Sequence, residues 1–158
     1  MKPRQAATSL GDLKAGGKGS LARTLSAIEA DPGNRVLTAL LDDAYNNPLG
    51  RVIGLTGPPG VGKSTLTNVL IRRWRAAGHS VGVLAVDPSS RISGGALLGD
   101  RTRFDTDPAD SGVFVRSLAA RDRLGGLSEL TVAAMVLMRA IYDRVLIETV
   151  GIGQSESD

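Results

Sequence analysis

Residues 57–65 have the types and spacing needed to bind phosphate. They read Gly-Pro-Pro-Gly-Val-Gly-Lys-Ser-Thr and fit the pattern G-x-x-x-x-G-K-[ST]. Glycines let the backbone form a cup whose N–H groups face an anion. Lys63 can reach the outer phosphates of a nucleotide, and the Ser64 hydroxyl can bind Mg²⁺. We predict a phosphate-binding loop made of Gly57, Pro58, Pro59, Gly60, Val61, Gly62, Lys63, Ser64 and Thr65.

Two acidic residues end apolar runs and are candidates for a metal site beside this loop. Asp87 ends the run 80–87, and Glu148 ends the run 143–148. Ligands of parallel sheets bind at the carboxyl ends of the strands, so we expect both acids at the edge that carries the loop. Mg²⁺ prefers such hard oxygen ligands. We predict that Glu148 supports Mg²⁺ together with Ser64, and that Asp87 and Asp100 are further candidate ligands. Each acid alone is equally well explained as a solvated strand end.

The elements around the loop must position these groups. Residues 51–56 are typical of a buried strand, and residues 66–77 have a helical pattern that closes at Gly78. Strand, glycine loop and helix in this order are the context that the motif needs, which disfavours a chance glycine turn. Further strands are expected at 80–87, 112–116 and 143–148, with a helix that Ser128 caps between the last two. This alternation predicts an α/β P-loop NTPase fold with a parallel sheet covered by helices on both faces.

The first part of the chain has a different character. Residues 1–19 are rich in glycine and lysine, and we expect them to be loosely ordered. Ser20 is the expected cap of a first helix, and Asp31 to Asn34 break it. A second helix is expected to carry an apolar face of Val36, Leu37, Leu40, Leu41 and Tyr45. We therefore divide the chain into an N-terminal helical segment, residues 1–49, and a P-loop domain, residues 50–158. The helical segment is expected to be scaffold, with a partner-facing arm as the alternative.

The composition narrows the class of protein. The hydrophobic content of 42% and charged content of 22% are ordinary for a soluble globular domain. The net charge is +3, without a basic run interleaved with aromatics, so we expect no nucleic-acid partner. No signal peptide or membrane-spanning run is seen, and no cysteine is present. We expect a cytoplasmic protein that binds no membrane.

Four stretches together resemble one family, the methylmalonyl-CoA mutase-associated G proteins of the MeaB/ArgK type, also called LAO/AO transport system ATPases. The similarity covers about residues 20–156. The stretches occur in the family's order, and the combination is much more specific than the phosphate loop alone. They are the loop at 57–65, Val-Asp-Pro-Ser-Ser at 86–90, Ser-Gly-Gly-Ala-Leu-Leu-Gly-Asp-Arg at 93–101, and Glu-Thr-Val-Gly-Ile-Gly-Gln-Ser-Glu at 148–156.

The resemblance implies a fold, a function and further site residues. It implies a SIMIBI-type P-loop GTPase that uses GTP/GDP and Mg²⁺. Such a protein protects a coenzyme-B12-dependent acyl-CoA mutase, gates its cobalamin loading and is usually a homodimer. The Mg²⁺ ligands, direct or through water, would be Ser64, Asp87, Asp100 and Glu148. Gly151 and Gln154 would begin a switch region in which the glycine senses the γ-phosphate, and the catalytic groups would be Lys63 and Gln154.

The sequence also departs from this family. The Asn-Lys-x-Asp motif that reads guanine is not found, nor are the further strands and dimerisation arm that the family carries after the Gly-Gln-Ser-Glu stretch. We therefore expect a C-terminally truncated form, and the preference for guanine rests on the resemblance alone. The alternatives are a P-loop ATPase or kinase linked to amino-acid transport and an inactive truncated remnant. A nickel-insertion G protein is disfavoured by a single histidine and no cysteine.

Overall fold

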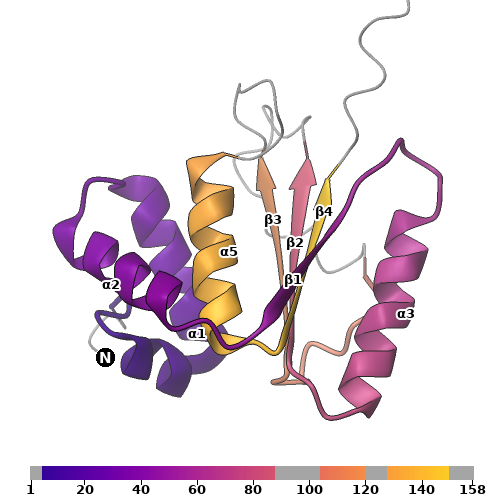
Figure 1. Cartoon of the computed structure of the whole chain (residues 1–158), viewed down its shortest axis with the longest axis horizontal. Coiled ribbons are helices and arrows are strands. Elements are labelled where there is room, and N and C mark those ends of the chain that lie inside the picture. Colours follow the sequence, from indigo (N-terminus) through magenta and orange to yellow (C-terminus); the bar gives the residue numbers. More distant parts are fainter. Residues whose placement is uncertain (1–4, 88–103, 120–127, 150–158) are drawn as a thin grey trace, which may run out of the picture.

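A computed structural model of the chain describes residues 5–87, 104–119 and 128–149 (Figure 1). The alternation of strands and helices after residue 50 is confirmed. The helices are α1 (Leu10–Ala30), α2 (Arg35–Asn46), α3 (Lys63–Ala76) and α5 (Glu129–Ile141). The strands are β1 (Arg51–Leu55), β2 (Val81–Asp87), β3 (Val113–Ala119) and β4 (Arg144–Thr149).

The four strands form one parallel sheet in the order β1-β4-β2-β3. β4 lies between β1 and β2, and its residue Glu148 is in register with Leu55 on one side and with Ala85 on the other. The carboxyl ends of these three strands therefore meet at one edge of the sheet. The α/β fold with a parallel sheet that the sequence predicts is confirmed.

Helices cover both faces of the sheet, with α3 on one face and α1, α2 and α5 on the other (Figure 1). β4 shows how the strands serve two cores. Val145 and Ile147 belong to the cluster that the N-terminal helices and α5 build, whereas Leu146 belongs to the cluster with Ile71 of α3. Because side chains alternate along a strand, Glu148 lies on the α3 side with Leu146.

The N-terminal region differs from our expectation. Residues 10–19, which we expected to be loosely ordered, belong to α1, and the prediction is wrong there. The helix begins after Ser9, whose side chain accepts a hydrogen bond from the Asp12 backbone N–H at 3.1 Å. Leu10 and Leu13 are buried in the core, which explains why this turn is helical despite its glycines. The sequence pattern is broken where the helix is kinked, at Gly17, which has a φ of 55°.

Ser20 was expected to cap the first helix, and this prediction is also wrong. It lies inside α1, where its side chain is 4% exposed and faces the core. In the second helix, α2, Leu37, Leu40 and Ala44 are the buried residues. Val36 and Tyr45, which we placed on the apolar face, are exposed. The cap of α2 is Asn34, whose side-chain oxygen accepts hydrogen bonds from two backbone N–H groups of the first turn.

Two element boundaries differ from the prediction. Helix α3 begins at Lys63 rather than at residue 66, so Lys63 and Ser64 are its first residues instead of part of the preceding loop. Strand β3 extends to Ala119 rather than ending at residue 116, because it stays paired with β2 along its whole length. The earlier helix start changes which residues share a face of α3.

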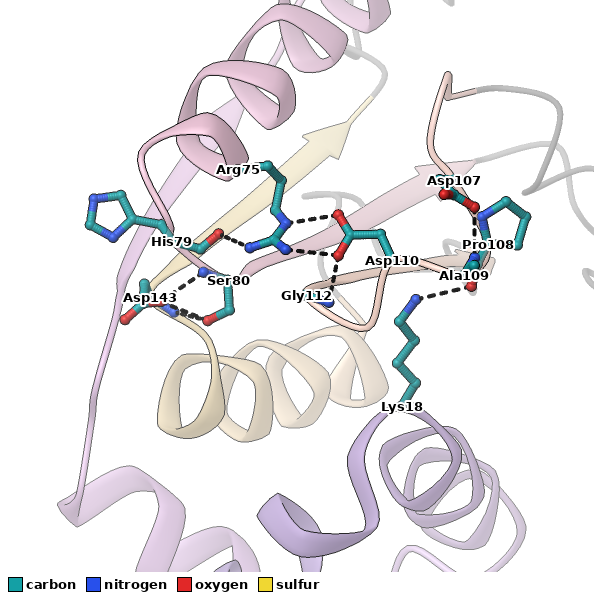
Figure 2. A network of polar contacts seen from close by, with 10 residues as sticks. All are labelled: Lys18, Arg75, His79, Ser80, Asp107, Pro108, Ala109, Asp110, Gly112 and Asp143. Carbon is teal, nitrogen blue, oxygen red and sulfur yellow. Dashed lines mark hydrogen bonds and ion pairs between the residues drawn. The ribbon is translucent and has the colours of Figure 1, made fainter.

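A polar network fixes the opposite edge of the sheet, where β2 and β4 begin (Figure 2). The Arg75 guanidinium donates two hydrogen bonds of 2.8 Å to the two carboxylate oxygens of Asp110, and a third of 2.8 Å to the His79 carbonyl. The Ser80 N–H and hydroxyl both donate to the Asp143 carboxylate, at 2.7 and 2.8 Å. These contacts tie the end of α3 to the starts of β2 and β4 and to the loop that precedes β3.

The network also reaches α1. The Lys18 ammonium donates a hydrogen bond of 3.4 Å to the Pro108 carbonyl (Figure 2). Hydrogen bonds from Arg75 hold the pKa of Asp110 below its usual value, and those from Ser80 do the same for the pKa of Asp143. Within the described ranges, no helix combines the length and the apolar character that crossing a membrane requires.

Candidate functional site

The loop between β1 and α3 has a backbone that requires glycine. Gly57, Gly60 and Gly62 have φ angles of 149°, 80° and 93°, in the region that side chains with a Cβ rarely adopt. Three such positions within six residues bend the chain sharply between the strand and the helix. The predicted glycine pattern therefore has a direct conformational reason at this point of the fold.

The loop leads straight into the N-terminus of α3. Gly62 occupies the cap position in a left-handed conformation, and no side chain forms a capping hydrogen bond there. The N–H groups of the first helical turn therefore face the loop without a capping side chain, at the positive end of the helix dipole. Such a helix start binds anions, and phosphate most often.

Lys63 bends back over the loop. Its ammonium donates hydrogen bonds to the carbonyl oxygens of Gly57 and Pro58, at 2.7 and 2.8 Å. A positive charge thus lies at the concave side of the glycine turn, next to the helix N-terminus. Both features attract an anion to the same place.

Glu148 is the acidic group of the site. Its side chain is 1% exposed, and a buried carboxylate is costly unless hydrogen bonds satisfy it. Two hydroxyl groups of α3 do so. The Ser64 hydroxyl donates to Oε1 at 3.0 Å, and the Thr67 hydroxyl donates to Oε2 at 3.3 Å. The parallel register of β4 and the start of α3 at Lys63 bring these three residues together.

The donor set of Ser64 and Glu148 fits a magnesium ion. A carboxylate and a hydroxyl are hard oxygen ligands, which Mg²⁺ prefers. A hydroxyl has one hydrogen to donate and two lone pairs, so Ser64 can bond to Glu148 and still offer a lone pair to a cation. The structure thus brings together two of the four predicted metal ligands.

The other predicted site residues are tested less directly. Asp87 ends β2 two residues beyond Ala85, the partner of Glu148, so its backbone lies at the expected edge of the sheet. Its side chain lies outside the described part of the chain. Asp100, Gly151 and Gln154 also lie outside the described residues. Across the described ranges, no cluster of three or more acidic, histidine or cysteine side chains suggests another metal site.

Sequence reasoning missed Thr67. The signal that could have found it is its spacing, because residues three apart lie on the same face of a helix. With the helix starting at Lys63, Ser64 and Thr67 form such a pair and both face β4. Placing the helix start at residue 66 hid this relationship.

Comparison with known proteins agrees with the geometry of the site. Residues 21–158 match the family model described as methylmalonyl Co-A mutase-associated GTPase MeaB. The chain is 44% identical over 148 residues to "Putative GTPase PH0274" of Pyrococcus horikoshii, covering 92% of this chain and 46% of that protein. It is 37% identical over 156 residues to GTPase ArgK of Escherichia coli, covering 96% of this chain and 47% of that protein.

A mouse protein is also similar. It is named methylmalonic aciduria type A homolog, mitochondrial, and it is 47% identical over 126 residues, which cover 77% of this chain and 30% of the mouse protein. The chain therefore spans less than half the length of these relatives.

Proposed function

The chain belongs to the family of methylmalonyl-CoA mutase-associated GTPases, and from this membership we propose that it binds GTP and GDP with Mg²⁺ and hydrolyses GTP. The observation that supports this most is the contact between Ser64 and the buried Glu148 beside the Lys63 loop. A phosphate cup and a pair of magnesium ligands side by side are what a nucleoside triphosphatase needs.

Each residue has a proposed role. The N–H groups of the loop and of the first turn of α3 bind the phosphates. The Lys63 ammonium exchanges its bonds to the Gly57 and Pro58 carbonyls for bonds to phosphate oxygens, since both are acceptors at the same place. Ser64 and Glu148 hold Mg²⁺, which when bound offsets charge on the phosphates that are separated by hydrolysis.

The remaining predicted residues complete the proposal. Asp87 and Asp100 are proposed as further Mg²⁺ ligands, direct or through water. Gly151 is proposed to sense the γ-phosphate, and Gln154 is proposed to orient the attacking water. Positioning and charge stabilisation provide most of the catalysis of phosphoryl transfer, so these groups need to be placed rather than chemically activated.

The biological role that we propose follows the family. The protein protects a coenzyme-B12-dependent acyl-CoA mutase and gates its cobalamin loading, as a homodimer in its full-length form. The family description and the name of the mouse relative, which refers to methylmalonic aciduria, support this direction. A pull-down with purified methylmalonyl-CoA mutase, in GTP and in GDP, tests it. We expect retention that depends on the nucleotide, and equal or absent retention in both would contradict the role.

The nucleotide specificity is tested with a fluorescent GDP analogue bound to the purified 158-residue chain. We expect GTP to displace the analogue, an equal concentration of ATP to displace little of it, and Mg²⁺ to tighten binding. Release of inorganic phosphate from GTP then separates a hydrolase from a protein that only binds. Equal displacement by ATP and GTP would favour the ATPase alternative, and binding without phosphate release would favour an inactive remnant.

A further inference from the structure

We propose that Thr67 is a positioning residue for the magnesium end of this site. Its hydroxyl holds the Glu148 carboxylate in the orientation in which that carboxylate supports Ser64 and Mg²⁺. The inference rests on the proposed function, because it concerns the same site, but it assigns a role to a residue outside the phosphate-binding motif.

The contacts divide the carboxylate between two donors. Ser64 donates to Oε1 at 3.0 Å, and Thr67 donates to Oε2 at 3.3 Å. Both hydroxyls come from one face of α3 and are one helical turn apart. Oε1 therefore faces the loop and the partly exposed Ser64, whereas Oε2 faces the core. Thr67 bonds to the oxygen that points away from the nucleotide, so its hydroxyl is not a competitor for the cation.

Thr67 lies where packing alone would place an apolar residue. Its side chain is 0% exposed, and it lies one turn before Ile71, which is 3% exposed and packs against Leu146 in the α3 core. Valine has nearly the same shape and would fill this position without burying a hydroxyl. The hydroxyl is thus explained by the carboxylate that it contacts and not by the packing of α3 on the sheet.

The hydrogen bond to Oε2 limits the rotation of the carboxylate. The last torsion of a glutamate side chain is broad, with two nearly equivalent states, and packing restrains it weakly. The bond from Ser64, which lies at the edge of the loop, restrains only Oε1. The bond from Thr67 on the opposite oxygen adds a second restraint on the plane of the carboxylate. Residues that orient metal ligands in this way commonly change metal affinity about 10- to 100-fold when they are replaced.

The test compares Thr67→Val with Thr67→Ser in the 158-residue chain. Binding of the fluorescent GDP analogue is measured in EDTA and over a series of Mg²⁺ concentrations. We expect Thr67→Val to raise the Mg²⁺ concentration for half-maximal effect by about tenfold. Its affinity in EDTA should stay within about twofold of the unchanged chain, because phosphate contacts do not involve Thr67. Thr67→Ser keeps the hydroxyl and should restore the Mg²⁺ dependence.

Several outcomes would overturn the proposal. An unchanged Mg²⁺ dependence in Thr67→Val would do so, and so would an equal loss of affinity in EDTA and in Mg²⁺, which indicates a structural role. If Thr67→Val does not fold, Thr67→Ala removes the hydroxyl without placing a second methyl group against Glu148, and the same pattern decides the question. If the unchanged chain binds no guanine nucleotide or shows no Mg²⁺ effect, the proposed function itself fails, a result that the variants do not imitate.

Discussion

The Lys63 ammonium bonds to two carbonyl groups of its own loop, Gly57 at 2.7 Å and Pro58 at 2.8 Å. In the proposed complex its partners are phosphate oxygens, so replacing it removes charge-assisted hydrogen bonds that nothing nearby replaces. We expect Lys63→Ala to bind the GDP analogue about 100-fold more weakly, which corresponds to roughly 3 kcal/mol. The measurement is a fluorescence titration.

The matched control is Lys14→Ala, since Lys14 is an exposed lysine of α1. Its removal should leave the affinity unchanged and separates the role of Lys63 from a general effect of net charge. Equal weakening by both variants would show that only the overall charge matters and would contradict the role assigned to Lys63.

Gly50 and Gly54 lie close together in the chain but in different surroundings. A Cβ added at Gly50 would collide with backbone atoms of Tyr142 and Asp143, which cannot turn away as a side chain can. A Cβ at Gly54 would meet nothing within 4 Å. We expect Gly50→Ala to lower the free energy of unfolding by about 1–3 kcal/mol, and Gly54→Ala to change it by less than about 0.5 kcal/mol. Urea unfolding measures both, and similar values would show that the entry to β1 is not tightly packed.

Among the elements, the end of α3 and the loop before β3 are joined by the pair Arg75–Asp110. The partner side chains are 30% and 28% exposed, and their geometry is bidentate. The pKa of Asp110 is lowered in the folded state, first by the hydrogen bond from Arg75. A group with a lowered pKa stabilises the fold above its unfolded pKa, about 3.9, and that stability is lost as the pH falls through its folded value.

We therefore expect Asp110→Asn to be less stable than the unchanged chain at pH 7, by roughly 0.5–1 kcal/mol. The difference should disappear as the pH falls below about 4, because the unchanged Asp110 then becomes protonated as well. Thermal unfolding at several pH values measures it. Asp42→Asn, at an exposed position of α2, is the control and should show no such difference. A gap for Asp110→Asn that persists at pH 2 would contradict the electrostatic explanation.

How far an element can be predicted depends on whether its own residues or distant ones decide it. The loop, the strands and most helices follow from local signals: glycines at positive φ, apolar runs and a serine cap. The first turns of α1 do not, because Gly16 and Gly17 oppose a helix locally and burial of Leu10 and Leu13 decides the outcome.

The same reason explains which parts of the site could be predicted. Ser64 and Glu148 follow from motif and strand end, and the structure brings them together. Thr67 depends on the first residue of α3 and on the register of β4, and boundaries are the least predictable property of an element. Asp87, Asp100, Gly151 and Gln154 stay predictions, since neither the described side chains nor the comparisons test them.

Over the whole molecule, the N-terminal helices and the sheet share one core. Leu25 of α1 and Leu40 of α2 belong to the same buried cluster as Leu137 of α5 and Ile147 of β4. The Thr24 hydroxyl also accepts a hydrogen bond of 2.9 Å from the Ala7 N–H, which holds the start of the described chain on α1. We therefore expect residues 1–49 and 50–158 to unfold together, although we divided them by sequence.

Leu25→Ala tests this expectation from a distance. Leu25 is 0% exposed, so its truncation should lower the free energy of unfolding by about 2–5 kcal/mol. Trp74, the single tryptophan, lies on α3 at the opposite face of the sheet. Its fluorescence and the far-UV circular dichroism should show the same, lowered midpoint.

Val36→Ala is the control, because Val36 is exposed on α2 and its truncation should leave both midpoints nearly unchanged. A Trp74 transition that stays in place while the circular dichroism shifts in Leu25→Ala would show two independent units.

The position of Glu148 in a central strand has a consequence for folding accuracy. A shift of β4 by one residue against its neighbours would exchange the two sets of side chains, since they alternate between faces. The carboxylate would enter the apolar cluster of Ile28, Leu40 and Leu137, and Ile147 would face the hydroxyls of α3. An alignment error in β4 would thus strand a charge in a greasy interior, so the acid proposed to hold magnesium also makes misaligned sheets unfavourable during folding.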